Sequence, residues 1–149
     1  MAVDINTYVE QRNPDGGWEF MTWPSYGPIG PFQRRNNTVF GFLADIRNFA
    51  GIPPVDAPRG LPPDVSDHVR AEFETWGTDG YAHSWVTVDE LAAVDYHASF
   101  EILDEGTEEP SGQTATILES LGGPYFADLL LLVRRNEQHP TRVVFWFDS

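Results

Sequence analysis

The chain has 149 residues and a mass of 16.8 kDa, which suits one domain with a buried core. Its net charge of -14 repels a phosphate backbone and disfavours a nucleic-acid-binding protein, and the absence of cysteine excludes disulfides, thiolate metal sites and cysteine nucleophiles. Hydrophobic residues make up 41% of the chain, a fraction typical of a globular protein.

The sequence predicts neither an export signal nor a membrane segment. Its first residues lack the basic and apolar regions of a secretory signal, and the longest apolar run, 129–133, is far too short to cross a bilayer. We therefore expect a cytoplasmic protein whose partners include neither membranes nor nucleic acid.

The N-terminal region predicts a β-hairpin. Apolar and polar residues alternate over residues 3–10, as they do in a half-buried strand. An Asn-Pro-Asp-Gly-Gly turn follows at 13–17, and the next stretch, as far as Trp23, is rich in aromatic residues. We expect a hairpin over residues 2–23 and a proline-rich loop over residues 24–31.

Two helices are predicted next along the chain. Apolar residues repeat at helical spacing over residues 37–50, and a glycine and two prolines at 51–54 end the pattern. After a loop rich in proline and glycine, a second helix begins at Asp64 or Ser66, both good capping residues, and runs to about Trp76.

The following region predicts shorter elements. Thr87 and Glu90 have the spacing of a capping box, which opens a short helix. Residues 96–103 alternate as in a strand, residues 104–113 are an acidic polar loop, and residues 115–121 form another short helix.

The end of the chain predicts a longer helix and a buried strand. Pro124 suits a first helical turn, and apolar residues then repeat at helical spacing as far as Val133, so this helix is expected to be buried on most sides. Residues 143–147 form a continuous β-branched and aromatic run, which is typical of a strand covered on both faces. The elements together predict a single α+β domain over residues 1–149, in which several helices cover a small, mainly antiparallel sheet that contains the N-terminal hairpin and the C-terminal strand.

Several short motifs resemble a family of small proteins from bacteriophages and prophages. They are the stretch Arg35 to Asn48, the RGLPPDVS run at 59–66, the HSWVT run at 83–87 with the Glu90-Leu91 pair, and the VFWFD run at 144–148. The resemblance spans most of the chain. It implies a phage or prophage setting, and hence the cytoplasm of a host cell, but it supplies no mechanism.

The distribution of positive charge points to a binding site. All nine basic residues are arginines, and none lies between Ala71 and Val133, where thirteen of the 23 carboxylates are found. An arginine on a glycine- and proline-rich loop of so acidic a chain pairs either with a carboxylate or with an anionic ligand.

Five residues are candidates for ligand binding. Arg47 lies at the border of the apolar face of the first helix, where a partly dehydrated guanidinium needs an acceptor. Arg59 stands in a rigid loop just before a helix start, where backbone N–H groups are available to an anion. His83 and Ser84 can donate hydrogen bonds to the same ligand, and Asp64 can orient an arginine.

Each candidate also has a structural interpretation. Arg47 can pair with an internal carboxylate such as Asp45, and Arg59 can hold its own loop to an acidic neighbour. His83 and Ser84 can simply bond to the backbone. The histidines lack metal-ligand spacing, so neither a metal nor another cofactor is expected.

Three functions follow from these patterns. The leading one is a non-enzymatic binding protein whose arginine- and histidine-lined pocket takes a small anionic ligand, such as a phosphorylated, nucleotide-like molecule. The second keeps this pocket and makes His83 the acid or base of a hydrolase acting on a phosphoester-type bond. The third is an interaction module or inhibitor that presents the acidic surface from Glu101 to Glu109 to a basic host protein.

Overall fold

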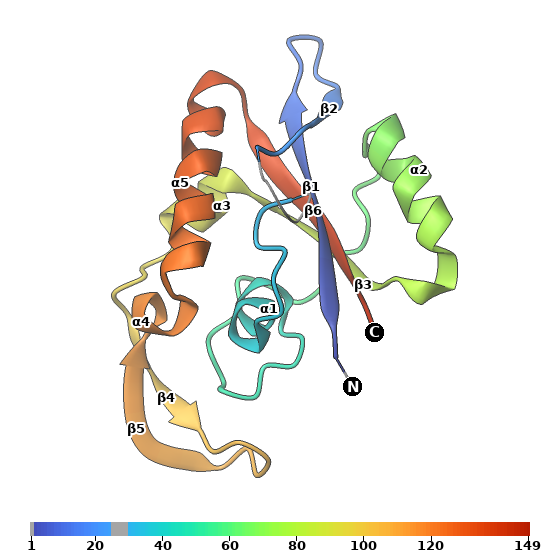
Figure 1. The fold of residues 1–149 in the computed structure, drawn as a ribbon. Coiled ribbons are helices and arrows are strands. Elements are labelled where there is room, and N and C mark those ends of the chain that lie inside the picture. The colour runs from blue at the N-terminus through green and yellow to red at the C-terminus, as the bar shows by residue number, and fades with distance from the viewer. Residues whose placement is uncertain (1, 25–29) are drawn as a thin grey trace.

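The computed structural model describes residues 2–24 and 30–149 and shows an α+β fold (Figure 1). Its main sheet is antiparallel, with the strand order β2-β1-β6-β3, and a separate hairpin joins β4 to β5. The strands are β1 (Asp4–Arg12), β2 (Trp18–Met21), β3 (Tyr81–Thr87), β4 (Ser99–Leu103), β5 (Pro110–Thr116) and β6 (Thr141–Asp148). The predicted sheet of N-terminal hairpin and C-terminal strand is confirmed.

Helices cover both faces of the main sheet. Those in the described residues are α1 (Asn37–Ala44), α2 (Asp67–Trp76), α3 (Val88–Ala93), α4 (Ile117–Leu121) and α5 (Gly123–Gln138), with a short 3-10 turn at Gly77–Asp79. Side chains of α1, α3 and α5 pack with one face of the sheet, whereas α2 lies on the other face (Figure 1). None of these helices combines the length and the apolar character that a bilayer span requires.

Strand β6 shows why both faces need cover. Val143, Phe145 and Phe147 belong to the larger core, whereas Val144 and Trp146 belong to the cluster beneath α2. All five are fully buried. Successive side chains of a strand point to opposite faces, so a continuous apolar run requires packing on both sides. The expectation for residues 143–147 is confirmed.

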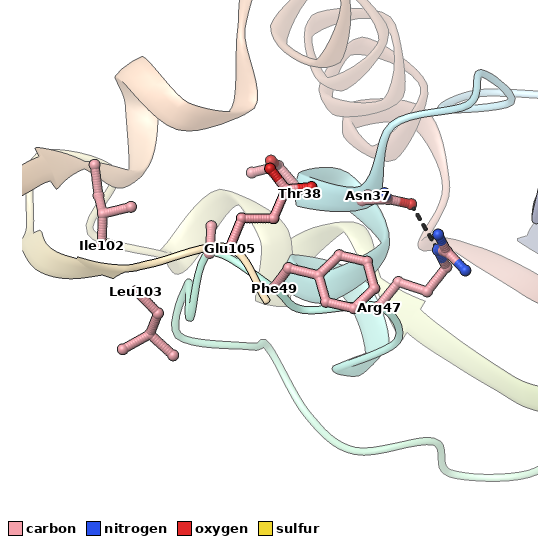
Figure 2. Close-up of a pocket in the computed structure, with 8 residues that line it drawn as sticks. Asn37, Thr38, Arg47, Phe49, Ile102, Leu103 and Glu105 are labelled. Carbon is pink, nitrogen blue, oxygen red and sulfur yellow. Dashed lines mark hydrogen bonds between the residues drawn. The ribbon is translucent and has the colours of Figure 1, made fainter. Parts of the chain in front are cut away.

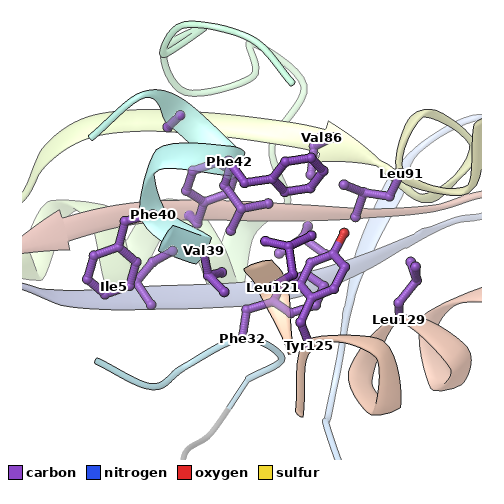
Figure 3. Close-up of a cluster of buried hydrophobic side chains, with 14 of the residues drawn as sticks. Ile5, Phe32, Val39, Phe40, Phe42, Val86, Leu91, Leu121, Tyr125 and Leu129 are labelled. Atoms are coloured by element: carbon purple, nitrogen blue, oxygen red, sulfur yellow. The ribbon is translucent and has the colours of Figure 1, made fainter. Parts of the chain in front are cut away.

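The larger core is centred on aromatic residues from α1 and α5 (Figure 3). Phe40 meets Phe147 of the sheet edge to face, with ring centroids 5.3 Å apart, and Phe42 meets Tyr125 in the same way at 5.7 Å. Phe32 stacks on Tyr125 at 4.8 Å. These contacts fix α1 and α5 against the sheet and against each other.

Helix α1 ends at residue 44, earlier than the apolar pattern predicts. Asp45 takes a left-handed conformation, with φ 58°, and its N–H donates to the carbonyl of Gly41 at 2.9 Å. Ile46 still packs against the core, which is why its spacing reads as a continued helix. Arg47 therefore lies in a loop, and its predicted place at the border of a helical stripe is wrong.

Two strands were not expected from the sequence. Residues 80–82 suggest a loop from the sequence, but Tyr81–Thr87 pairs with β6, and the register shifts between Tyr81 and Ser84. Strand β5 takes in the end of the acidic loop expected at 104–113 and the first residues of the helix expected at 115–121. Helix α4 therefore starts only at Ile117. The bulge interrupts the alternation of β3, and β5 is largely exposed, so neither strand carries a period-two apolar pattern.

Helix α5 is less buried than expected. Tyr125, Leu129 and Leu132 are buried, but Leu130 is 53% exposed and Leu131 is 36% exposed. The helix lies over one side of the sheet, so one face meets the core and the opposite face meets solvent. The prediction of a helix buried on most sides is therefore wrong.

Candidate functional site

Arg59 is surrounded by acceptors from the protein itself. Its guanidinium donates to both oxygens of Glu90, at 2.9 and 2.5 Å, to Asp56 Oδ2 at 3.1 Å and to the carbonyl of Trp85 at 3.1 Å. The hydrogen bonds from Arg59 are the main reason that the pKa of Glu90 falls to about 2. This network ties the loop around Arg59 to the start of α3.

Ser84 and His83 hold the same loop. Ser84 is buried, and its Oγ accepts from the backbone N–H of Arg59 at 3.0 Å. The carbonyl of His83 accepts from the N–H of Gly60 at 2.8 Å. The two segments therefore meet, as the sequence suggested, but they meet through bonds within the protein.

The imidazole of His83 lies among aromatic rings beneath α2. It meets Phe73 edge to face at 4.9 Å and lies 5.6 Å from the ring of Trp146. Burial lowers the pKa of His83, because the charged imidazolium loses solvent. Its Nε2 atom is buried and has no hydrogen-bond partner within the described residues.

Asp64 pairs with an arginine that was not among the candidates. Arg142 donates to Asp64 Oδ1 at 3.0 Å and, through Nε, to Oε1 of the fully buried Glu10 at 2.8 Å. Burial would raise the pKa of Asp64, but the hydrogen bonds and charge of Arg142 outweigh it and lower that pKa. The second oxygen of Glu10 accepts from the N–H of Ser66 at 2.8 Å. The network joins β1 and β6 to the start of α2.

Arg47 has a different environment. Its Nε donates to Asn37 Oδ1 at 3.1 Å, and its guanidinium lies over the ring of Phe49 at 5.1 Å (Figure 2). Within residues 2–24 and 30–149, no carboxylate forms an ion pair with it. Its terminal N–H groups are therefore available to a ligand.

Arg47 stands at one end of a pocket of about 300 Å³. Figure 2 shows Arg47 and Asn37 at one end of the pocket, Ile102 and Leu103 at the other, and Phe49 between them. Thr38 and the exposed Glu105 complete the polar lining. The arrangement offers a cation and hydrogen-bonding groups at one end and an apolar surface at the other, with the carboxylate of Glu105 between them.

Two backbone features build this pocket. The N–H of Leu103 donates to the carbonyl of Ala50 at 3.0 Å, which attaches the end of β4 to the loop that carries Arg47. Gly51 has a φ of 76°, and a Cβ there would lie 2.7 Å from Cγ of Leu103. A glycine is needed both for this conformation and for the close packing of Leu103.

The sequence missed most of the lining of this pocket. Phe49 and Leu103 read as ordinary apolar positions of a helix and a strand, and residues 36–38 read as a helix start. The start of the helix expected at residue 37 is confirmed, because Asn36 caps it and accepts from the N–H groups of Thr38 and Val39. Nothing local indicates that the two segments meet.

Comparison of the chain with models of protein families, with curated proteins and with solved structures finds no match. The function must therefore rest on the chemistry of the sites. Within the described residues no group of histidine and carboxylate side chains is suited to hold a metal ion. Of the two arginines proposed from the sequence, Arg59 is paired with carboxylates, whereas Arg47 lines a pocket and forms no ion pair in the described structure.

Proposed function

We propose that this protein binds a small molecule with an anionic group and a flat or apolar part in the pocket beside Arg47. The observation that carries the proposal is that Arg47 lines a pocket and its guanidinium forms no ion pair within the described structure. Arg59, Asp64 and Ser84 already have internal partners, so the proposal rests on Arg47 alone among them.

The two ends of the pocket suit the two parts of such a ligand. A guanidinium can bind a phosphate or carboxylate through two parallel hydrogen bonds, and Thr38 adds a hydroxyl donor. Phe49, which is 39% exposed, offers a ring on which a base can stack. A volume of about 300 Å³ is at the lower end for ligand sites. A mononucleotide-sized, phosphorylated ligand is therefore the class we propose.

Isothermal titration calorimetry with the four ribonucleoside monophosphates, and with inorganic phosphate alone, tests the proposal. We expect at least one nucleotide to bind and Arg47→Gln to weaken that binding by about tenfold or more, which is the loss expected for a charged hydrogen bond. Stronger binding of the nucleotide than of phosphate would assign a role to the apolar end.

Arg70→Gln is the matched control. Arg70 is an exposed arginine on α2 whose one side-chain hydrogen bond within the described part of the chain is a long one, to the carbonyl of Pro63 at 3.5 Å. This variant should bind the nucleotide as the wild type does. Absence of binding by every nucleotide, or equal affinity in Arg47→Gln, would refute the proposal.

Product analysis after the same titrations separates binding from hydrolysis. A hydrolase would need the buried Nε2 of His83 to reach a substrate, and His83 does not line the pocket beside Arg47. We expect the nucleotides to be recovered unchanged. The phage or prophage setting suggested by the motifs remains a prediction. In that setting, such a pocket would sequester a nucleotide of the host.

An acidic interaction module is the second candidate. Asp104, Glu105, Glu108 and Glu109 are all exposed at the turn between β4 and β5. A basic partner could meet these carboxylates together. If the protein binds a nucleotide but does not bind a basic partner protein, the pocket is favoured over this candidate.

A further inference from the structure

A second cavity, of about 220 Å³, lies between strands β1 and β2 and helix α2. It shares no lining residue with the pocket beside Arg47. Its lining includes three aromatic side chains, a carboxylate and several polar side chains. The aromatic residues are Tyr8, Phe20 and Trp76, the carboxylate is Glu72, and the polar residues used below are Asn6 and His68. Its chemistry is therefore unlike that of the first pocket.

The aromatic walls of this cavity are held by their neighbours. Tyr8 stacks on the fully buried Trp146, with ring centroids 4.8 Å apart. Phe20 stacks on His68 at 4.0 Å, with an angle of 17° between the rings, which joins β2 to α2. Rings fixed in this way lose little further side-chain entropy when a ligand binds between them.

The charges around the cavity are negative. Glu72 supplies a carboxylate, and no arginine is among the described residues that line the cavity. Asn6 donates from Nδ2 to Asp148 at 2.8 Å, so its amide oxygen is left as an acceptor. Burial and the charge of Glu72 raise the pKa of Tyr8 to about 12, so its ring stays a neutral phenol at physiological pH. Among the described lining residues an anion would meet no arginine and only the imidazole of His68, which stacks on Phe20.

We propose that this cavity binds an organic cation of the alkylammonium or guanidinium class, with Glu72 as its counter-ion and the rings of Tyr8, Phe20 and Trp76 as its walls. The negative faces of aromatic rings attract cations within about 6 Å, and the attraction grows as the cation loses water. The net charge of -14 also raises the local concentration of cations near the protein.

Choline and 3,3-dimethyl-1-butanol test the proposal, because they have the same shape and differ in charge. Tryptophan fluorescence, at constant ionic strength, reports occupancy of the cavity through Trp76. We expect choline to bind and the neutral analogue to bind about tenfold more weakly or not at all. Equal affinities, or no binding of choline, would overturn the proposal.

Variants assign the binding to this cavity. Glu72→Gln should weaken the binding of choline by about fivefold or more, because it removes the counter-ion and keeps the shape. Glu74 is an exposed carboxylate on the same helix, and Glu74→Gln should bind choline as the wild type does. If Glu72→Gln binds choline as the wild type does, the cation lies elsewhere and the proposal fails.

A further titration separates a free amine from an arginine side chain of a partner protein. N-acetyl-arginine methylamide carries the guanidinium on a peptide unit. If it binds more tightly than choline and loses affinity in Glu72→Gln, the natural ligand is the side chain of a basic protein. Tighter binding of choline, with the same loss in the variant, assigns a free small cation.

Discussion

The arginines of this acidic chain differ in what surrounds their guanidinium groups. Arg142 is 4% exposed and lies between Glu10, Asp64 and the ring of Trp18, which is 4.0 Å from its guanidinium carbon. Such a pair is costly to break, because the partner that remains is a buried charge. Arg59 is bound in a similar way by Glu90, whereas among the described residues Arg47 has only Asn37 and Phe49.

The sequence indicated that these arginines need acceptors but not which acceptors they find. Glu10 and Arg142 are direct partners across β1 and β6, although 132 residues separate them. Asp64 was predicted to orient an arginine of the binding site, but the arginine it bonds to is Arg142, which was not among the candidates. Which side chains meet depends on strand register, and no local pattern encodes register between distant strands.

Replacing Glu90 by glutamine should make the protein less sensitive to acid. The pKa of Glu90 falls to about 2, mainly because Arg59 donates hydrogen bonds to it. A carboxylate whose folded pKa is depressed stabilises the fold above its unfolded pKa, about 4.3, and loses this contribution as the pH falls through the folded value. Urea unfolding should therefore show a smaller loss of stability in Glu90→Gln than in the wild type between about pH 5 and about pH 2.

Glu74→Gln provides the comparison for this measurement, since Glu74 is exposed and forms no ion pair in the described residues. It should keep the acid dependence of the wild type. If Glu90→Gln also loses stability with the wild-type slope, the Arg59–Glu90 pair does not contribute as we infer.

The loop after α1 depends on a close contact between two elements. Asn48 donates to the carbonyl of Ile52 at 2.8 Å and accepts from its N–H at 3.0 Å, so its side chain takes the place of backbone pairing. Its amide lies against Gly41 of the helix. This contact sets the path of the loop that carries Arg47 and Phe49.

Gly41→Ala should destabilise the protein and weaken ligand binding beside Arg47. A Cβ at Gly41 would lie 2.7 Å from both Cγ and Oδ1 of Asn48, so the loop must shift. Alanine favours a helix by about 1 kcal/mol over glycine, but overpacking costs about 1–3 kcal/mol, and we expect the clash to outweigh the gain. Urea unfolding and the nucleotide titration measure the two effects.

Gly123→Ala is the control for this substitution. Gly123 begins α5, and a Cβ there would have no atom within 4 Å. We expect it to be neutral or slightly stabilising, because alanine restricts the unfolded chain. A Gly41→Ala variant as stable as Gly123→Ala would show that the loop adapts without cost.

The elements differed in how well the sequence predicted them. Ser66 caps α2 and Thr87 with Glu90 caps α3, as expected, because a cap involves residues only three positions apart. The end of α1 and the strand β3 were missed. Strand β3 depends on pairing with the distant β6, whereas the end of α1 depends on a nearby side chain, Asn48, whose bonds to Ile52 helical spacing does not indicate.

The charge of the whole molecule should make its stability rise with salt. With a net charge of -14, the surplus carboxylates repel one another in the folded chain. Salt weakens this repulsion, because it shortens the screening length from about 30 Å at 0.01 M to about 8 Å at 0.15 M. Exposed ion pairs such as Arg35 with Asp4 contribute little that salt could remove. The midpoint of urea unfolding should therefore rise over this range of sodium chloride.

Urea is the suitable denaturant here, since guanidinium chloride would itself supply salt. Thermal unfolding at the same salt concentrations gives a second measure of the trend. A midpoint that falls as salt is added would mean that the ion pairs outweigh the overall repulsion.

Local patterns were sufficient to predict the α+β class, the hairpin, the buried C-terminal strand and most helix starts. These features arise from alternation, helical spacing and capping, which act over a few neighbouring residues. The partners of Arg59 and Asp64, the pocket beside Arg47 and the aromatic cavity beneath α2 emerged from the folded chain. They join residues far apart in the sequence, and the packing of the sheet and helices brings them together.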